Sequence, residues 1–172
     1  CHNPESQHAR PELMLRPNLC IGCLACMDIC HAGCISSQNG IIITNPENCT
    51  MCEACADVCF ADAREIVGRS MSVEDVMNEI LKDRVFYEQS GGGVTFSGGE
   101  PLQQNEFLLS LLQACKKEEI STAVDTSGFA PWAILEAMLP YVDLFLYDLK
   151  VINDSVHTKT TGVSNEIILS NL

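Results

Sequence analysis

The chain has 172 residues and an acidic composition, with 10 Lys and Arg residues against 23 Asp and Glu residues and a formal net charge of −13. This charge repels phosphate backbones and offers no polybasic patch to a membrane surface, which disfavours nucleic acid and membranes as partners. No apolar run approaches the length that a bilayer requires, so we expect a soluble protein with room for two domains.

Two copies of one cysteine pattern lie in the first third of the chain. Their members are Cys20, Cys23, Cys26 and Cys30, followed by Cys49, Cys52, Cys55 and Cys59. This is the spacing of ferredoxins that hold two [4Fe–4S] clusters, in which the fourth cysteine of each run binds the other cluster. We therefore predict one cluster on Cys20, Cys23, Cys26 and Cys59, and a second cluster on Cys49, Cys52, Cys55 and Cys30.

Zinc sites and disulfides account for these cysteines less well. Structural zinc sites also use thiolates, but a zinc ribbon needs only two pairs of ligands, whereas each run here has four cysteines at ferredoxin spacing. A secreted disulfide framework is disfavoured because no signal peptide is recognisable at the start of the sequence. Ferredoxins usually have Pro after the fourth cysteine, where this chain has His31 and Phe60, and that difference affects only the local turn. Oxygen-sensitive clusters and free thiols indicate an anaerobic cytoplasm.

The two cysteine runs form an internal repeat over residues 18–66, which has little core of its own. Within it, the Asn39-Gly40 pair followed by the apolar run Ile41–Thr44 predicts a turn and a strand. The remaining residues, roughly a hundred, are enough for a second unit with a real core.

From about residue 70 onward, helix and strand signals alternate. Ser72 and Asp75 match a capping box, and the apolar residues after them repeat at helical spacing, namely Val73, Val76, Met77, Ile80 and Leu81. Short apolar strands are expected at residues 94–96, 122–124 and 144–147, and helices are expected after Pro101 and from about Pro131 to Met138. Strands that alternate with helices predict βα units and a parallel sheet.

Polar residues follow each of these three strands, in the runs Ser97–Glu100, Asp125–Gly128 and Asp148–Lys150. Each run alone is compatible with a simple turn or with solvated side chains. Because the carboxyl ends of parallel strands share the ligand-binding edge of a sheet, the three runs together predict a convergent site.

Taken in order, these features resemble the activating enzymes of glycyl radical enzymes, members of the radical S-adenosylmethionine (SAM) superfamily. The stretches that match are residues 1–6, the two-cluster insert, residues 94–101, 125–128, 148–150 and 161–165. The resemblance implies an α/β fold, a partial (β/α) barrel of the radical SAM type with an inserted two-cluster ferredoxin-like domain. The implied domains are residues 1–17 as a remnant of the radical SAM cluster loop, residues 18–66 as the insert, and residues 67–172 as the partial barrel.

The resemblance also implies that the chain is a fragment of a longer protein. The family binds its catalytic [4Fe–4S] cluster through a C-x3-C-x2-C run, and Cys1 matches only the third of those cysteines. The first two cysteines of that run, and part of the six-unit barrel, would lie outside this chain. Since one thiolate cannot hold a cubane, we expect the chain by itself to be inactive.

Site residues are likewise implied by the resemblance. The methionyl amino group of SAM would be received by Gly98, Gly99 and Glu100, and the ribose and carboxylate side of SAM would be contacted by Asp148 and Lys150. A monovalent cation would be bound by Asp125, Thr126 and Asp148. Simpler roles also fit, because Asp125 could cap the following turn and Lys150 could pair with Asp148 at the surface.

The implied function is activation of a partner glycyl radical enzyme. Reductive cleavage of SAM would produce a 5′-deoxyadenosyl radical, which removes a hydrogen from a glycine Cα of the partner. The reductant would be a flavodoxin or ferredoxin, and the two insert clusters would either relay or store its electrons or have a structural role. The activator would act as a monomer. The alternative is an electron-transfer ferredoxin fused to an inert α/β unit, without radical chemistry.

Three further residues invite simple interpretations. His157 is either a contact of the active site or a histidine on a helix surface. Cys34 and Cys115 lie outside the ligand pattern, and we expect both to be buried as small apolar side chains.

Overall fold

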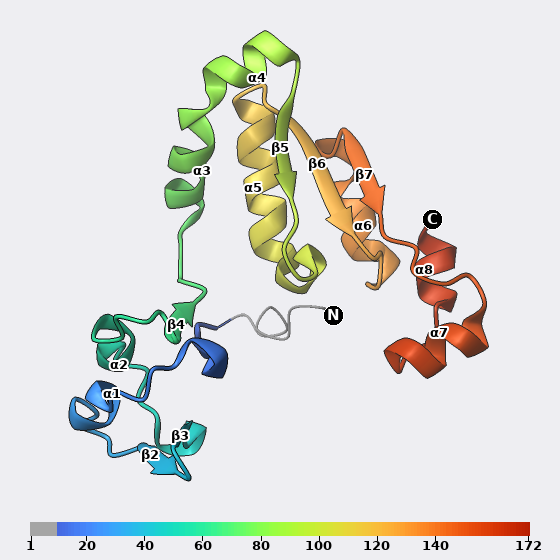
Figure 1. The fold of residues 1–172 in the computed structure, drawn as a ribbon. Coiled ribbons are helices and arrows are strands. Elements are labelled where there is room, and N and C mark those ends of the chain that lie inside the picture. Colours follow the sequence, from blue (N-terminus) through green and yellow to red (C-terminus); the bar gives the residue numbers. More distant parts are fainter. Residues whose placement is uncertain (1–9) are drawn as a thin grey trace. The chain divides into compact units, whose positions relative to one another are not determined.

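The computed structural model describes residues 10–172, which form two compact units, one of them Arg10–Ser70 and the other Met71–Leu172. The first unit contains both cysteine runs, and the second contains the three polar strand ends (Figure 1). Each unit has a small apolar core of its own. Across residues 10–172, no helix is both long enough and apolar enough to span a membrane.

The cysteine repeat of the sequence is also a repeat of structure. Each half has a 3-10 turn, a one-turn helix and a strand: η2 (Pro17–Leu19), α1 (Ala25–Asp28) and β2 (Ile35–Gln38), then η3 (Pro46–Asn48), α2 (Ala54–Asp57) and β4 (Arg64–Val67). Every element begins twenty-nine positions after its counterpart. The residues before the two helices, Leu24 and Glu53, both lie in the left-handed region, with φ of 64° and 65°. The backbone therefore turns in the same way in both halves.

Two antiparallel strand pairs complete this first unit. β1 (Glu12–Leu15) pairs with β4, and β2 pairs with β3 (Ile41–Thr44). Asn39 and Gly40 join β2 to β3 with φ values of 52° and 81°, so the predicted turn and strand are confirmed. The core of the unit is small, and its buried members are Cys26, Cys34 and Ile35.

The second unit is built on a three-stranded parallel sheet with the order β5 (Gly93–Phe96), β6 (Ser121–Thr126) and β7 (Leu144–Tyr147). The predicted parallel α/β arrangement is therefore confirmed. Gly93 is required where β5 meets β6, because a Cβ there would lie 1.9 Å from the carbonyl oxygen of Ser121.

Helices α5 (Asn105–Lys117) and α6 (Trp132–Met138) contribute to the main core beside the sheet (Figure 1). Side chains alternate along β6, so that Thr122, Val124 and Thr126 are buried whereas Ala123 and Asp125 are only partly buried. The core joins one helix face to this buried side of the strand, and its members include Leu108, Leu112, Val124, Leu135 and Met138. Two 3-10 turns, η4 (Pro101–Gln104) and η5 (Leu139–Tyr141), precede α5 and follow α6.

Helices α3 (Val73–Lys82) and α4 (Arg84–Ser90) precede the sheet. The capping box is confirmed, since the Asp75 N–H donates to Ser72 Oγ at 3.1 Å and the Ser72 N–H donates to an Asp75 carboxylate oxygen at 2.8 Å. Met77 and Ile80 pack in a second core with α5, where the Cys115 thiol donates to the Met77 sulfur at 3.8 Å. The predicted amphipathic helix thus buries the face that its spacing indicated.

Helices α7 (Asp154–Thr161) and α8 (Glu166–Asn171) follow β7. The Tyr147 hydroxyl at the end of β7 donates to the carbonyl oxygen of Ile168 at 3.1 Å. The side-chain amide of Asn171 donates to the carbonyl oxygens of Gly128 and Ala130, at 2.9 and 2.8 Å. These bonds fix α8 against the loop that follows β6.

Candidate functional site

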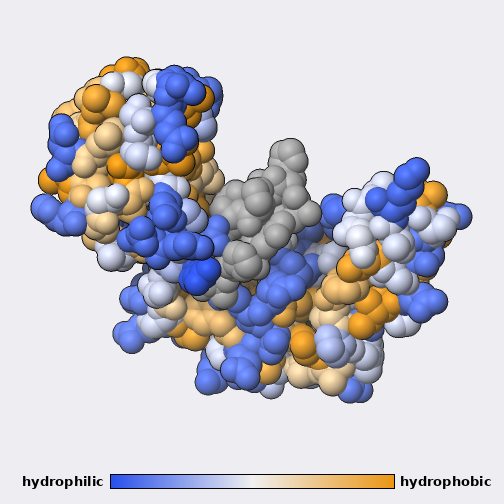
Figure 2. Space-filling model, turned by 90° about the horizontal axis from the view of Figure 1, so that it is seen from below, coloured by the Kyte–Doolittle hydropathy of each residue, from blue (hydrophilic) through white to orange (hydrophobic). Residues whose placement is uncertain are grey.

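The three polar runs gather at one edge of the sheet because β5, β6 and β7 are parallel and end on the same side (Figure 1). Ser97–Glu100 follows β5, Asp125–Gly128 overlaps and follows the end of β6, and Asp148–Lys150 follows β7. In the space-filling view from the side on which the strands end, a band of hydrophilic residues runs beside hydrophobic patches (Figure 2). Residues 97–99 and 148–150 are exposed, so the edge is polar and accessible at both of these runs.

Glu100 connects the loop after β5 to the loop after β6. One carboxylate oxygen accepts from the Thr126 hydroxyl at 2.5 Å and from the Leu102 N–H at 3.2 Å. The second oxygen accepts from the N–H and the hydroxyl of Ser127, at 2.9 and 2.5 Å. Four donors on one carboxylate hold the two loops in a fixed arrangement.

The two glycines before Glu100 form an exposed turn with φ values of +89° at Gly98 and +69° at Gly99. Left-handed backbone of this kind is easy for glycine and strained for other residues. A Cβ at Gly98 would meet no atom within 4 Å among the described residues, so open space borders the backbone there. A ligand can approach the peptide groups of this turn closely.

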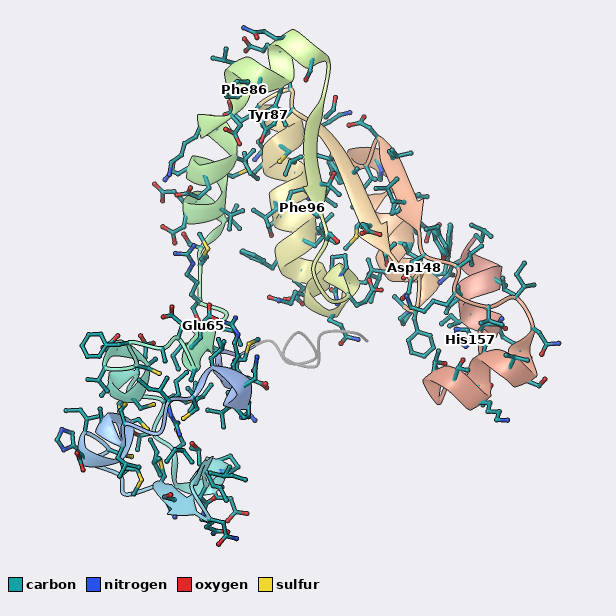
Figure 3. The ribbon with its side chains drawn as sticks, viewed as in Figure 1. Glu65, Phe86, Tyr87, Phe96, Asp148 and His157 are labelled. Atoms are coloured by element: carbon teal, nitrogen blue, oxygen red, sulfur yellow. The ribbon has the colours of Figure 1, made fainter. Side chains whose placement is uncertain are left out.

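The aspartates of the edge have protein partners. Asp125 accepts from the Ser97 hydroxyl at 2.9 Å, which links the ends of β5 and β6. Asp148 forms an ion pair with Lys150, and these side chains are 49% and 55% exposed. Figure 3 shows Asp148 at the end of β7. The surface pairing of Asp148 with Lys150, one of the two alternatives for these residues, is present, and both remain accessible to a ligand.

The residues expected to share a monovalent cation are not all brought together. Thr126 is 2% exposed, and its hydroxyl points to Glu100 on the buried side of β6, whereas Asp125 lies on the opposite side of the strand. The Thr126 carbonyl accepts the Asp148 N–H at 2.9 Å. The Thr126 hydroxyl is therefore turned away from a site shared by Asp125 and Asp148.

His157 is buried, which corrects the expectation of a histidine on a helix surface. It is 4% exposed, and its Nδ1 lies 2.9 Å from the carbonyl oxygen of Val163 (Figure 3). A carbonyl can only accept, so Nδ1 donates there and the Nδ1–H tautomer is present in the neutral ring. Thr161 Oγ lies 3.1 Å from the same nitrogen. In this structure His157 holds the loop between α7 and α8.

Asn165 is a positioning residue that the sequence analysis did not single out. It is 2% exposed, and its side-chain amide donates to the carbonyl oxygens of Val151 and Ile152, at 2.9 and 2.8 Å. Its N–H donates to Asp154 at 2.9 Å, and this bond is the main reason why the pKa of Asp154 is lowered. These bonds fix the segment that directly follows Lys150. The signal was available, because Asn165 closes the last stretch that resembles the activating enzymes.

The eight cysteines of the two runs line two separate pockets in the first unit. One pocket has an empty volume of about 510 Å³, solvent-open space included, and its cysteines are Cys20, Cys23, Cys26 and Cys59. The second has about 380 Å³ on the same measure, and its cysteines are Cys30, Cys34, Cys49, Cys52 and Cys55. The fold thus separates the cysteines into the two sets that the crossed ferredoxin pattern predicts, with Cys34 added to the second. Cys1 lies outside the described residues.

The cysteines of each set line a pocket and do not converge on the position of a single metal ion. Within residues 10–172, no three His, Cys, Asp or Glu side chains converge as ligands of a single metal ion, and every described cysteine is a free thiol. A zinc site requires four ligands around one ion, whereas a cubane accepts its thiolates at separate iron atoms, so metal analysis distinguishes the two.

The second pocket contains an additional cysteine, Cys34, beside the predicted ligand Cys30. Cys34, as expected, is buried, at 6% exposed, and its sulfur lies 3.4 Å from that of Cys30. Burial raises the pKa of Cys34 to about 11, and the Cys34 thiol in turn lowers the pKa of Cys30. Burial also raises the pKa of Cys55, against the opposing charge of Arg64.

Known protein families match both parts of this chain. The Radical SAM superfamily model matches residues 45–172, and a 4Fe–4S binding domain model matches residues 17–33. The chain is 49% identical to trans-4-hydroxy-L-proline dehydratase activating enzyme of Clostridioides difficile, over 100% of the chain and 57% of that protein. It is 43% identical to choline trimethylamine-lyase activating enzyme of Oleidesulfovibrio alaskensis, over 100% of the chain and 56% of that protein.

Benzylsuccinate synthase activating enzyme of Thauera aromatica is 41% identical, over 100% of the chain and 54% of that protein. The chain thus spans a little over half the length of these curated relatives. A solved domain of pyruvate-formate lyase-activating enzyme from Bacteroides vulgatus is 42% identical, with a TM-score of 0.43, and the likeness covers 46% of this chain and 50% of that one. The resemblance to activating enzymes of glycyl radical enzymes is confirmed. Because the family match extends over most of the chain and includes the whole parallel sheet, the chain belongs to the radical SAM superfamily.

Proposed function

We propose that this chain is part of an activating enzyme that uses SAM and iron–sulfur clusters to place a radical on a partner glycyl radical enzyme. The observation that supports this most directly is the exposed Gly98-Gly99 turn, which Glu100 holds at the polar edge of the sheet. The curated relatives are all named as activating enzymes, which supports the same class of partner.

The residues of the edge would have distinct tasks in binding SAM. Gly98 and Gly99 would present their peptide groups to the methionyl amino group, since glycine carries no side chain and a Cβ at Gly98 would meet no described atom within 4 Å. Lys150 would supply a positive charge for the methionyl carboxylate, and Asp148 would accept from the ribose hydroxyls. Glu100 has its lone pairs directed at four protein donors, so we assign it to holding the turn rather than to binding the ligand directly.

The cofactors supply the chemistry that protein side chains cannot provide. When bound, the catalytic cluster would supply the electron for reductive cleavage of SAM to methionine and the 5′-deoxyadenosyl radical, which is the species that would take the glycine hydrogen. The chain's part is to orient SAM at the sheet edge and to limit the access of water.

We also propose that Arg10–Ser70 is a ferredoxin-like domain with two [4Fe–4S] clusters. Each pocket contains the complete four-cysteine set that the crossed pattern requires, and the short helices and turns before the cysteines repeat in both halves. The clusters would relay electrons from a flavodoxin or ferredoxin to the catalytic cluster, and the activator would act as a monomer.

The activity is tested with the full-length protein, reconstituted with iron and sulfide and reduced under anaerobic conditions. We expect formation of 5′-deoxyadenosine and, with the partner enzyme added, a glycyl radical signal in electron paramagnetic resonance (EPR). Lys150→Ala should weaken SAM binding about tenfold, because a charge-assisted hydrogen bond contributes about 1.5–3 kcal/mol. Lys159→Ala, which removes the same charge from an exposed position of α7, is the matched control. Full clusters without any 5′-deoxyadenosine would leave only electron transfer as the function.

The two-cluster domain is tested by metal analysis of anaerobically purified protein. Residues 10–70 should account for about eight iron and eight sulfide per chain, with no zinc. Cys30→Ser should disturb the cluster held by the second run, and Cys59→Ser the cluster held by the first, because the fourth cysteines cross over. Cys115→Ser, in the core of the sheet-containing unit, should leave the iron content unchanged. Stoichiometric zinc in place of iron would contradict the proposal.

A further inference from the structure

The two halves of the cysteine repeat differ at one buried position. Ile35 begins β2 and Arg64 begins β4, and the repeat makes these two residues equivalent. Ile35 is 7% exposed and Arg64 is 6% exposed. An apolar side chain in one half is thus replaced by a buried positive charge in the second half.

The Arg64 guanidinium lies beside the cysteines. Its Nη1 donates to the Thr44 hydroxyl at 2.9 Å and lies 4.0 Å from the sulfur of Cys55, a predicted ligand of the second cluster. Arg64 also lines the pocket of Cys20, Cys23, Cys26 and Cys59, so its side chain lies between that pocket and the sulfur of Cys55.

Arg64 has no carboxylate within salt-bridge distance among residues 10–172. Its neighbour Glu65 points to the opposite face of β4 and pairs with Arg16 at 2.5 Å (Figure 3). A buried guanidinium without an opposite charge is costly, and buried charges in proteins are normally paired or bound to a ligand of opposite charge. The thiolates of a bound cluster, which carry net negative charge, are the available counter-charge in this part of the chain.

We propose that Arg64 is the counter-charge of the cluster held by Cys30, Cys49, Cys52 and Cys55, and that it makes this cluster the easier of the two to reduce. The inference depends on the proposed two-cluster domain. Each one-electron reduction adds a negative charge to a cluster, and a positive charge close to a ligand sulfur stabilises the reduced form. The guanidinium contacts the ligand sulfur of Cys55, whereas the equivalent Ile35 packs with Cys26 and offers no charge to that ligand of the first cluster. The sequence repeat therefore builds two similar sites with different electron affinities.

The test is a reductive titration of the full-length protein with dithionite, followed by EPR, with iron content measured for every variant. Arg64→Gln and Arg64→Leu should lower the equilibrium constant for reduction of the higher-potential cluster at least about tenfold, which is 59 mV for a one-electron couple. Arg64→Lys retains the charge, so its equilibrium constant for reduction should stay within about threefold of the wild-type value.

Two control variants separate a buried charge from a change in net charge or packing. Arg69→Leu removes an exposed positive charge from the same unit, and Ile35→Leu changes the equivalent buried position without changing charge. In both variants the equilibrium constant for reduction should stay within about twofold of the wild-type value. Solvent screens the exposed charge that the first variant removes, and the second variant changes no charge.

Each outcome decides the proposal. Unchanged potentials in Arg64→Gln protein that holds its full iron would overturn it. If the neutral variants lose one cluster while Arg64→Lys keeps both, the charge itself is required, which supports the proposal. If Arg64→Lys also loses iron, the shape of arginine is what matters, and the counter-charge role is rejected. Wild-type protein without iron would instead refute the two-cluster domain.

Discussion

Replacing Glu100 offers a direct test of how the polar edge is held together. The carboxylate receives four hydrogen bonds, from Leu102, from Thr126 and two from Ser127. Thr126 is 2% exposed, so in Glu100→Ala protein its hydroxyl loses its acceptor with little access to water, which costs about 1–3 kcal/mol. Water can replace the carboxylate at the partly exposed Ser127, so these bonds add about 0.5 kcal/mol. We expect a total loss of about 1.5–3.5 kcal/mol in the free energy of unfolding.

Urea unfolding followed by tryptophan fluorescence measures this loss. Trp132 is the only tryptophan, and it begins α6, so its signal reports on the unit that contains the sheet. Glu100→Gln should lower the free energy of unfolding by less, about 1 kcal/mol. The amide oxygen still accepts a hydrogen bond, but the amide NH2 group faces the Ser127 N–H, which is also a donor. Glu136→Ala on the exposed face of α6 is the control and should change stability by less than about 0.5 kcal/mol.

A second measurement checks the electrostatic part of the same argument. Burial raises the pKa of Tyr147, and the negative charge of Glu100 raises it further. Both Glu100 variants remove that charge, so the pKa of Tyr147 should fall, as followed by tyrosinate absorbance. If Glu100→Ala leaves both the unfolding free energy and the pKa of Tyr147 at their wild-type values, Glu100 does not hold the two loops as the structure indicates.

Three further predictions follow from the same unit. Gly128→Ala should lower the free energy of unfolding by more than about 2 kcal/mol, since the φ of Gly128 is +71° and a Cβ would lie 1.8 Å from the Tyr147 hydroxyl. Gly98→Ala should lower it by only about 1 kcal/mol, the backbone penalty. Equal urea midpoints for the two variants would contradict this. The pKa of Asp154 is lowered in the folded protein, so its charge adds stability above about pH 3.9. That stability is lost as the pH falls through the pKa of Asp154 in the folded state. When urea midpoints are measured between about pH 2 and 6, Asp154→Asn should lack this acid-dependent loss. Burial raises the pKa of Cys115 to about 11. Iodoacetamide at about pH 8 should therefore label Cys115 far more slowly in folded protein than in urea, which peptide mass mapping measures. Equal labelling rates would show that this core is open to solvent.

Local sequence signals were sufficient for the regular elements. The capping box at Ser72 begins α3, and the Asn39-Gly40 turn joins β2 to β3. The apolar runs became the parallel strands, with boundaries that moved by at most two residues. Such signals succeed because helix caps, tight turns and side-chain periodicity depend on residues close together in the chain. The short strands β1 and β4 were not predicted, because they pair with each other across the whole cysteine repeat.

Roles that depend on distant partners could not be read in the same way. The sequence allowed His157 as a surface residue or a site contact, yet it is buried and bonded to the Val163 carbonyl. Thr126 was grouped with Asp125, although neighbours on a strand point to opposite faces and its hydroxyl bonds to Glu100. Both cases concern the direction of a side chain, which tertiary packing decides.

The sequence by itself determined the chemistry that is available, because cysteine spacing and the order of polar strand ends are properties of the chain. It also determined the resemblance to activating enzymes. Only the tertiary structure decided which groups meet: Glu100 with the end of β6, Asn165 with the segment after Lys150, and Arg64 with Cys55. The physical reason is that each of these contacts joins residues far apart in the chain, so its geometry exists only after the strands and helices have packed.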